Sequence, residues 1–242
     1  MGEIMHFIVD LHVHTTASGD AYSTLMDYVN YAKEFNINGF GITEHGPDNP
    51  VGPHEFYFAN MNTIPRFIDN VLVLKGVDAN ITDYEGTLDI KEELLDDLDY
   101  AIASFHELVL SSGTVEENTQ AILGALKKSK VRILGDLGNP RYPVDYNQIV
   151  DACLGANVAI EVNDRRLLKE ESTSSVESYK DFIQYAYEKG VTIILSSDSH
   201  FHESLAEFNK CFQLLDSLGI PRDYPINYRR DVFFDWLNID LG

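Results

Sequence analysis

The sequence has few cysteines and no long apolar run. Its 242 residues include two cysteines, Cys153 and Cys211, and each lies in a segment with helical apolar spacing. We therefore expect two buried thiols and no disulfide. No apolar stretch approaches the ~18 residues that cross a bilayer, and the first residues lack the basic and apolar stretches of a signal peptide. These absences predict a cytoplasmic protein without a membrane partner.

Basic residues are also scarce. Lys and Arg together number 18 against 39 Asp and Glu, which gives a net charge of −21. Such a surface repels a phosphate backbone at long range, so we expect no nucleic-acid partner. The apolar content of 44%, with 13 Phe and 13 Tyr, is that of a globular protein. Because there is no linker-like stretch and no internal repeat, we expect a single domain over residues 1–242.

Short apolar runs alternate with amphipathic segments, which is the pattern of βα units around a parallel sheet. The clearest helical spacing runs from Leu25 to Phe35 and from Phe182 to a stop signal at Gly190. We therefore expect an α/β fold with one closed or nearly closed barrel. The expected strands are Phe7–Leu11, Gly39–Ile42, Val71–Lys75, Tyr100–Ser104, Val131–Leu134, Val158–Val162 and Thr192–Leu195. The other expected helices are Glu116–Ser129, Tyr146–Leu154, Leu205–Leu218 and Arg229–Leu237.

Histidine and acidic residues follow most of these strands, where parallel α/β barrels carry their active sites. Asp10, His12 and His14 alternate, so they share one face of an extended chain. A single strand-end histidine is more often a satisfied polar residue than a ligand, but the pattern recurs along this chain. The further strand-end residues are Glu44, His45, Asp78, His106, Asp136, Asp198 and His200. Imidazole and carboxylate together suit Zn, Fe or Mn, and this set has ligands for more than one ion.

Seven short runs carry a family resemblance. They are DLHVHTTASGDAYSTL, GITEHGPD, LKGVDANI, ASFHE, GNPRY, AIEVN and SSDSH. In this order they resemble the successive motifs of the PHP (polymerase and histidinol phosphatase) family, in particular its short stand-alone YcdX-like phosphatases. The resemblance extends from about residue 8 to residue 235. It implies a distorted seven-stranded (β/α)7 TIM-like barrel that hydrolyses phosphate monoesters with two to three divalent metal ions, Zn, Mn or Fe, at the C-terminal strand ends.

The resemblance also implies a set of ligands for each ion. One ion would take His12, His14, Asp78 and Asp198, a second would share Asp78 and take His106 and Asp136, and a third would take Asp20, His45 and His200. The nucleophile would be a metal-bound hydroxide, so no side chain is expected to attack the substrate. The carboxylates of Asp10 and Glu44 are candidates to orient the imidazoles.

Three of these ligands depart from the pattern of the relatives. Asp20 and Asp136 stand where the relatives have His, and Asp78 stands where they have a bridging Glu. Because carboxylate is a harder ligand than imidazole, we expect the site to favour Mn or Fe over Zn. Asp78 is one methylene shorter than Glu, so we expect its backbone to lie further inward for the side chain to bridge two ions.

The residues that grip the substrate are less clearly marked. Arg66, which follows Pro65 in a segment similar to a loop of the relatives, is the first candidate for binding phosphate. His54, Asn118 and Arg141 are further substrate-binding candidates. The Arg165–Arg166 pair fits either a phosphate contact or an exposed loop. We expect a small-molecule phosphate ester as the substrate.

Two other functions remain open at this point. A metal-dependent amidohydrolase also begins with His-x-His and ends with a late Asp, although no strand-end lysine here suits a bridging carbamate. The third hypothesis is a metal-binding scaffold in which the Asp substitutions have weakened catalysis. The sequence leaves open which ester is hydrolysed, which metal is native and whether the chain forms a homo-oligomer.

Overall fold

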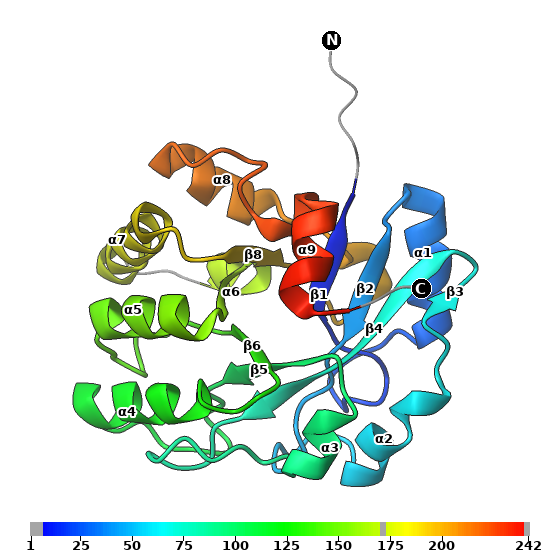
Figure 1. Ribbon diagram of the computed structural model, residues 1–242, viewed down its shortest axis with the longest axis horizontal. Helices are drawn as coiled ribbons and strands as arrows, with labels where there is room; N and C mark the ends of the chain where they lie inside the picture. Colours follow the sequence, from blue (N-terminus) through cyan, green and yellow to red (C-terminus); the bar gives the residue numbers. More distant parts are fainter. Residues whose placement is uncertain (1–6, 170–172, 240–242) are drawn as a thin grey trace.

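The structure, a computed structural model that describes residues 7–169 and 173–239, is a nearly closed barrel of parallel strands wrapped by helices (Figure 1). The strands pair in chain order, and β3 (Phe67–Ile68) adds a short antiparallel edge to β4. The seven parallel strands are β1 (Val9–Val13), β2 (Gly39–Ile42), β4 (Val71–Asn80), β5 (Tyr100–Ser104), β6 (Val131–Leu134), β7 (Ala159–Asn163) and β8 (Ile193–Ser196). The predicted α/β barrel is confirmed.

The helices lie outside this barrel, and no helix of the described residues is long and apolar enough to cross a membrane. The α-helices are α1 (Leu25–Phe35), α2 (Glu55–Ala59), α3 (Glu92–Asp96), α4 (Val115–Ala125), α5 (Tyr146–Ala156), α6 (Asp164–Lys169), α7 (Thr173–Lys189), α8 (Asn209–Leu218) and α9 (Arg230–Leu237). The 3-10 turns are η1 (Met61–Thr63), η2 (His202–Ser204) and η3 (Ile226–Tyr228).

Local signals explain several helix boundaries. Thr24 and Thr114 cap α1 and α4 in capping boxes with the residue three positions on, Asp27 and Glu117. The helix predicted from Leu205 begins only at Asn209, because a 3-10 turn and the positive φ of Ala206 precede it. The prediction that the Arg165–Arg166 pair lies in an exposed loop was wrong, because both residues belong to α6.

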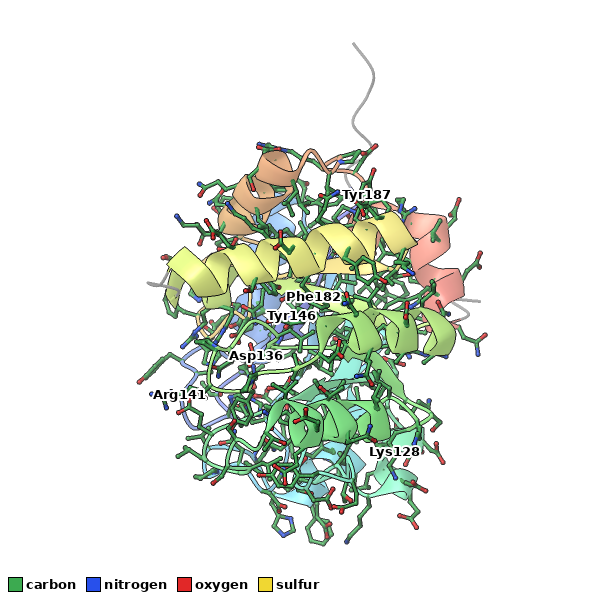
Figure 2. All side chains as sticks on the ribbon, turned by 90° about the vertical axis from the view of Figure 1, so that its left-hand side faces the viewer. Lys128, Asp136, Arg141, Tyr146, Phe182 and Tyr187 are labelled. Carbon is green, nitrogen blue, oxygen red and sulfur yellow. The ribbon has the colours of Figure 1, made fainter. Side chains whose placement is uncertain are left out.

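Two apolar layers hold the barrel together. An inner layer fills the barrel, and an outer layer lies between the strands and the helices. Tyr100 crosses the interior, and its hydroxyl donates to the Leu11 carbonyl at 2.7 Å. Gly41 makes this crossing possible, because a Cβ there would lie 1.8 Å from the Tyr100 hydroxyl oxygen. In the outer layer, Tyr146 of α5 and Phe182 of α7 stack with ring centroids 4.4 Å apart (Figure 2).

The predicted thiols also lie in this packing. Cys153 and Cys211 are buried and form no disulfide, as expected from the sequence.

The barrel closes between β1 and β8 by side-chain and loop contacts. Near the C-terminal strand ends, Ser199 exchanges backbone hydrogen bonds with His12 and His14. Further down the seam, the buried Asn227 amide donates to the carbonyls of Val9 and Leu195 at 2.7 and 2.8 Å. Its oxygen accepts from the Leu195 N–H at 2.7 Å. One side chain therefore takes the place of a strand-to-strand hydrogen-bond ladder.

The N-terminal end of the barrel is covered by α9. Phe233, Trp236 and Leu237 of this helix are buried against the inner layer, and the rings of Phe7 and Phe233 meet edge to face at 5.5 Å. Trp236 donates its indole N–H to the carbonyl of Asn157, just before β7. The apolar cover closes this end of the barrel, which leaves the C-terminal strand ends at the opposite end as the place for a functional site.

Candidate metal centre

A cavity of about 270 Å³ opens at the C-terminal ends of the strands. Eight of the nine predicted metal ligands line it, and the ninth, His14, is buried with its Nε2 3.1 Å from His12 Nε2. The lining residues are His12, Asp20, His45, Asn49, Val51, Asp78, His106, Glu107, Leu108, Asp136, Arg165, Asp198 and His200. The strand ends thus gather the histidines and aspartates that the sequence places far apart.

The first group of ligands comes from β1 and the turn after β8. The Nε2 atoms of His12 and His14 lie 3.7 and 3.4 Å from Asp198 Oδ1. Two imidazole nitrogens and a carboxylate oxygen therefore point at one space, which is the donor arrangement that a bound cation requires. The sequence placed His12 after its strand, but β1 runs to Val13, so the ring projects from the strand itself.

Asp78 lies at the centre of the second group. Its Oδ2 is 3.0 Å from His45 Nδ1, 3.2 Å from His106 Nε2 and 3.7 Å from His12 Nε2. Its Oδ1 is buried and has no hydrogen-bond partner among the described residues. The strand that carries it, β4, continues to Asn80 and bonds to the residues after β2, which brings the short side chain within reach of three imidazoles.

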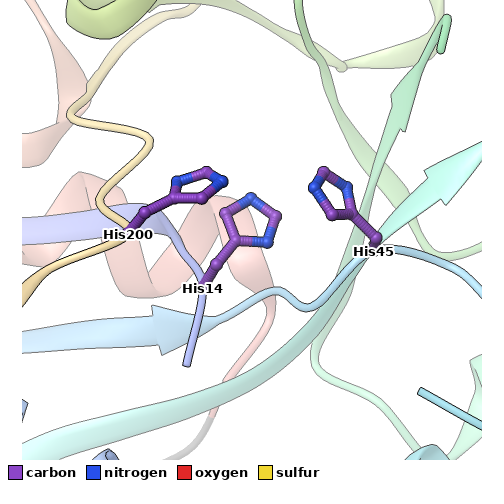
Figure 3. Close-up of side chains that lie close together, drawn as sticks. All are labelled: His14, His45 and His200. Atoms are coloured by element: carbon purple, nitrogen blue, oxygen red, sulfur yellow. The ribbon is translucent and has the colours of Figure 1, made fainter. Parts of the chain in front are cut away.

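A third group forms the open edge of the cluster. Asp20 Oδ2 lies 3.3 Å from His200 Nε2 and 3.7 Å from His45 Nε2. Figure 3 shows the ring of His14 between those of His200 and His45, with ring centroids 4.5 and 4.2 Å away. Asp20 Oδ1 has no partner among the residues that the structure describes.

Two aspartates of the cluster have an unusual backbone. Asp136 and Asp198 both have a φ of +52°, in the left-handed region that side chains other than Gly seldom adopt. The Asn163 amide, at the end of β7, lies 3.2 Å from Asp136 Oδ1 and 3.4 Å from Asp198 Oδ2. Asp136 Oδ2 lies 3.9 Å from His106 Nε2. The turns after β6 and β8 are thus bent so that both carboxylates face the cavity.

The protonation equilibria in the cluster are strongly perturbed. Burial, reinforced by the charge of His45, lowers the pKa of His14 to about 3. Burial alone would lower the pKa of His45, but hydrogen bonds with Asp20 and Asp78 outweigh it and raise that pKa to about 10. Burial and the carboxylate of Asp198 raise the pKa of Asp136 to about 6. The buried carboxylates therefore need positive charge beside them, from imidazolium groups or from cations.

The support for the imidazoles differs from the prediction. Neither Asp10 nor Glu44 contacts an imidazole. Asp10 instead accepts from Ser197 and from the Ala206 N–H, which ties down the loop that follows β8. Glu44 reaches His14 only through Ser18. Its carboxylate accepts from the Ser18 hydroxyl, whose oxygen lies 3.5 Å from His14 Nδ1.

The carboxylate that holds an imidazole directly is Glu161. It lies on β7, is fully enclosed, and accepts from His12 Nδ1 at 2.6 Å. It also accepts from the Ser196 hydroxyl and the Asp136 N–H. Sequence reasoning missed this role, although a glutamate inside an otherwise apolar strand was a readable signal.

The predicted substrate-binding residues lie away from the cavity. Arg66 makes a two-pronged ion pair with Asp99, immediately before β5 and therefore at the opposite end of that strand. His54 caps α2, where its Nδ1 accepts from the Phe56 N–H. Arg66 and His54 thus have structural partners outside the cavity lining, and their prediction as substrate-binding residues rests only on their position in a loop.

Asn118 and Arg141 have structural partners as well. Asn118 is buried in α4, and its amide donates to the carbonyls of Gly113 and Pro143. Arg141 is exposed (Figure 2) and pairs with Glu107, which itself lines the cavity. Of the arginines considered from the sequence, Arg165 is the one that lines the cavity.

The donor set fits divalent cations. Five imidazoles and four carboxylates converge, and the rings of His12 and His14 are held nitrogen to nitrogen. One buried oxygen each of Asp20 and Asp78 has no partner within residues 7–169 and 173–239. A βα barrel with such a cluster at its C-terminal strand ends belongs to the class of α/β barrels with a candidate metal site at that end.

Comparisons with known proteins identify the family within this class. The family model described as the PHP domain matches residues 10–165. The chain is 41% identical to a protein of Clostridium acetobutylicum named "Probable phosphatase", over 96% of this chain and 95% of the relative. It is 40% identical to a protein of the same name from Shewanella piezotolerans, over 97% and 94% of the two chains. The chain therefore belongs to the PHP family.

A solved structure has the same fold. It is a histidinol phosphate phosphatase from Lactococcus lactis, complexed with zinc, L-histidinol and phosphate. The match has a TM-score of 0.60 and 19% identity and covers 89% of this chain and 95% of that one. The predicted family and the predicted enzyme class, a PHP-type phosphatase, are confirmed.

Proposed function

We propose that the protein hydrolyses small-molecule phosphate monoesters with two to three divalent cations bound at the strand-end cluster. The observation that carries this proposal is the convergence of three imidazoles on the single carboxylate of Asp78. A carboxylate with three imidazoles around it supports a role as a ligand for more than one cation, and a pair of cations would brace the attacking and leaving oxygens in phosphoester hydrolysis.

The contacts support three ligand sets. His12, His14, Asp78 and Asp198 would hold one ion, Asp78, His106 and Asp136 a second, and Asp20, His45 and His200 a third. His45 Nδ1 is also within hydrogen-bond distance of Asp78, so this imidazole stands between the second and third sets. With four carboxylates among nine ligands, we expect a preference for Mn or Fe over Zn.

Bound cations would neutralise the phosphoryl oxygens and make water a stronger nucleophile. Neighbouring side chains orient the proposed ligands toward the cavity. Because Glu161 accepts from Nδ1 of His12, the Nε2 lone pair of that ring faces the cavity. Asn163 holds Asp136 and Asp198 in place from one side.

The cavity wall supports attack by water. The described residues that line it include no Ser, Thr, Cys or Lys, and its Asp and His residues would be occupied as cation ligands and so would not act as covalent nucleophiles. The absence of lysine from this lining also gives no support to the amidohydrolase alternative, which would use a lysine carbamate.

Elemental analysis combined with metal add-back tests the proposal. Purified protein is stripped of metal, loaded separately with Mn, Fe or Zn, and assayed for release of phosphate from p-nitrophenyl phosphate and for cleavage of amide and lactone substrates. We expect two to three ions per chain and phosphate release restored most strongly by Mn or Fe. A protein that binds metal but turns over no substrate would favour the scaffold alternative, and amide or lactone cleavage would favour the amidohydrolase.

A further inference from the structure

One basic side chain lines the metal cavity and has no part in the proposed hydrolysis. Arg165 is the only Arg or Lys among the described residues of the cavity wall. It shares this space with five acidic residues, yet no ion pair between described residues involves its guanidinium, whereas Arg66, Arg141 and Arg222 each have a carboxylate partner. A guanidinium that lines an acidic cavity without such a partner is available to a ligand.

The backbone of Arg165 is fixed relative to the metal centre. The residue before α6, Asn163, accepts from the Arg166 N–H at 2.9 Å while its amide contacts Asp136 and Asp198. The first residue of the helix, Asp164, accepts from the N–H groups of Lys210 and Cys211 at 2.6 and 3.0 Å. Arg165 therefore starts from an anchored turn beside the ligands, and its long side chain lies along the cavity wall.

The other wall residues outside the ligand set are mostly uncharged. Val51 and Leu108 are aliphatic, and Asn49 is an amide. Glu107 is acidic, but Arg141 pairs with it and offsets its charge. Beyond the ligand cluster, a substrate would thus meet aliphatic surface and the guanidinium of Arg165. No ion pair between described residues joins this guanidinium to a carboxylate of the cluster, so its hydrogen bonds are not taken up by the proposed cation ligands.

We propose that Arg165 binds a second anionic group of the substrate, and that the enzyme prefers small phosphate monoesters that carry one. This inference rests on the proposed phosphatase function. A guanidinium pairs with either a carboxylate or a phosphate through two parallel hydrogen bonds. The cavity, about 270 Å³, is smaller than the ~300–1,000 Å³ common for drug-sized ligands, so the two anionic groups would be separated by a short chain.

The test compares three esters of one chain length: propyl phosphate, 3-phosphonooxypropanoate and propane-1,3-diol bisphosphate. Phosphate release by the metal-loaded full chain gives kcat/KM for each, corrected for the two equivalent esters of the bisphosphate. We expect the wild type to prefer an ester with a second anionic group. The measured quantity is the kcat/KM for the ester with a second anionic group divided by the kcat/KM for propyl phosphate. In Arg165→Met this ratio should fall about tenfold or more, which is the effect of losing a charge-assisted hydrogen bond.

Two further variants sharpen the result. Arg165→Lys keeps the charge without the planar fork and should lose part of the preference. Arg222→Met removes an exposed arginine that pairs with Asp216 and does not line the cavity, so its ratio should match the wild type. The ester whose preference falls in Arg165→Met, the carboxylate or the bisphosphate, identifies the anionic group that Arg165 binds. Equal ratios in the wild type and Arg165→Met would overturn the inference.

Failure of the proposed function has a different signature. If the wild type released phosphate from none of the three esters, the hydrolytic proposal would fail. Calorimetric binding of the non-hydrolysable 3-phosphonopropanoate then decides the role of Arg165 without turnover. Weaker binding to Arg165→Met than to the wild type and to Arg222→Met supports the inference, and equal affinity for all three rejects it.

Discussion

The two ends of this barrel are built from the same strands but have opposite chemistry. At the N-terminal end, α9 packs Phe233 and Trp236 against the apolar interior, and the Asn227 amide satisfies the backbone of the open seam. At the C-terminal end, carboxylate oxygens of Asp20 and Asp78 are buried with no partner in the described part of the chain, and two aspartates have left-handed backbone conformations. The polar groups of one end are paired by side chains of the chain itself, whereas at the other end cations and a substrate would pair them under the proposed function.

This difference separates stability from function within one fold. Apolar burial at the covered end stabilises the barrel whether or not metal is bound. The unpaired carboxylate oxygens at the open end lower the stability of the fold, as is common where a site is preorganised for a ligand. Substitutions at the two ends should therefore have separable effects, and the following predictions test that separation.

The largest effect is expected from Asp78→Asn at the open end. The amide keeps the size of the side chain but removes the charge that His12, His45 and His106 face. Turnover should fall by about 10³- to 10⁴-fold because the shared ligand is lost. Metal content and p-nitrophenyl phosphate turnover are measured together, with near-UV circular dichroism to verify folding.

Asp78→Glu is the matched control, since it keeps the carboxylate and should retain measurable turnover. Normal metal content and turnover in Asp78→Asn would contradict the role of this residue.

At the covered end, Phe233→Ala should lower the free energy of unfolding by about 3–5 kcal/mol, because it leaves a cavity among Phe7 and the inner layer. Urea unfolding of the metal-free protein measures the change. The KM of the native protein should stay as in the wild type. Phe56→Ala, at a ring that is 73% exposed, should change stability by less than about 0.5 kcal/mol. A raised KM in Phe233→Ala would show that the two ends are coupled.

Asn227→Ala tests the seam with a smaller effect. It removes three hydrogen bonds and leaves buried groups of Val9 and Leu195 unpaired, which should cost about 2–3 kcal/mol of unfolding free energy. Hydrogen exchange should show faster opening of β1 and β8 than of β5. Asn209→Ala, at an exposed asparagine, serves as the control. Unchanged protection of β1 and β8 would mean that another contact closes the barrel.

The smallest effect is expected from Glu161→Gln, which acts on the metal through another residue. Without the carboxylate on Nδ1, the His12 ring is a weaker and less well oriented ligand, so metal affinity should fall about 10–100-fold. Competition with a chelator gives the dissociation constants of the variant and the wild type. Glu117→Gln, in the capping box of α4, should leave them unchanged. Equal metal affinities for Glu161→Gln and the wild type would argue against the role of Glu161 in orienting His12.

Much of the fold was predictable because hydrophobic patterning is local. The strands Gly39–Ile42, Tyr100–Ser104 and Val131–Leu134 have the predicted bounds, since each is a short apolar run between turn signals. β4 runs five residues beyond its predicted end, because Asp78 and Asn80 are polar and their burial at the site is invisible to apolar patterning. The five-residue helices α2 and α3 were missed because they are too short to show a period.

The site was predictable in its composition more than in its contacts. Every predicted metal ligand lies in or directly beside one cavity, because a parallel barrel brings all C-terminal strand ends to the same rim. The partners of the arginines were not predictable, since they depend on which distant carboxylate the fold places beside each arginine. Arg66 pairs with Asp99, and Arg165 pairs with no described carboxylate.

The sequence by itself determined the barrel, the family and the types of ligand, because strand alternation and ordered motifs are written along the chain. Only the tertiary structure decided that Glu161 supports His12, that Asp10 turns to the loop after β8, and that Asn163 links two aspartates to α6. These contacts join residues up to 196 positions apart. Their geometry depends on register, strand length and backbone twist, which are properties of the packed barrel and of no single segment.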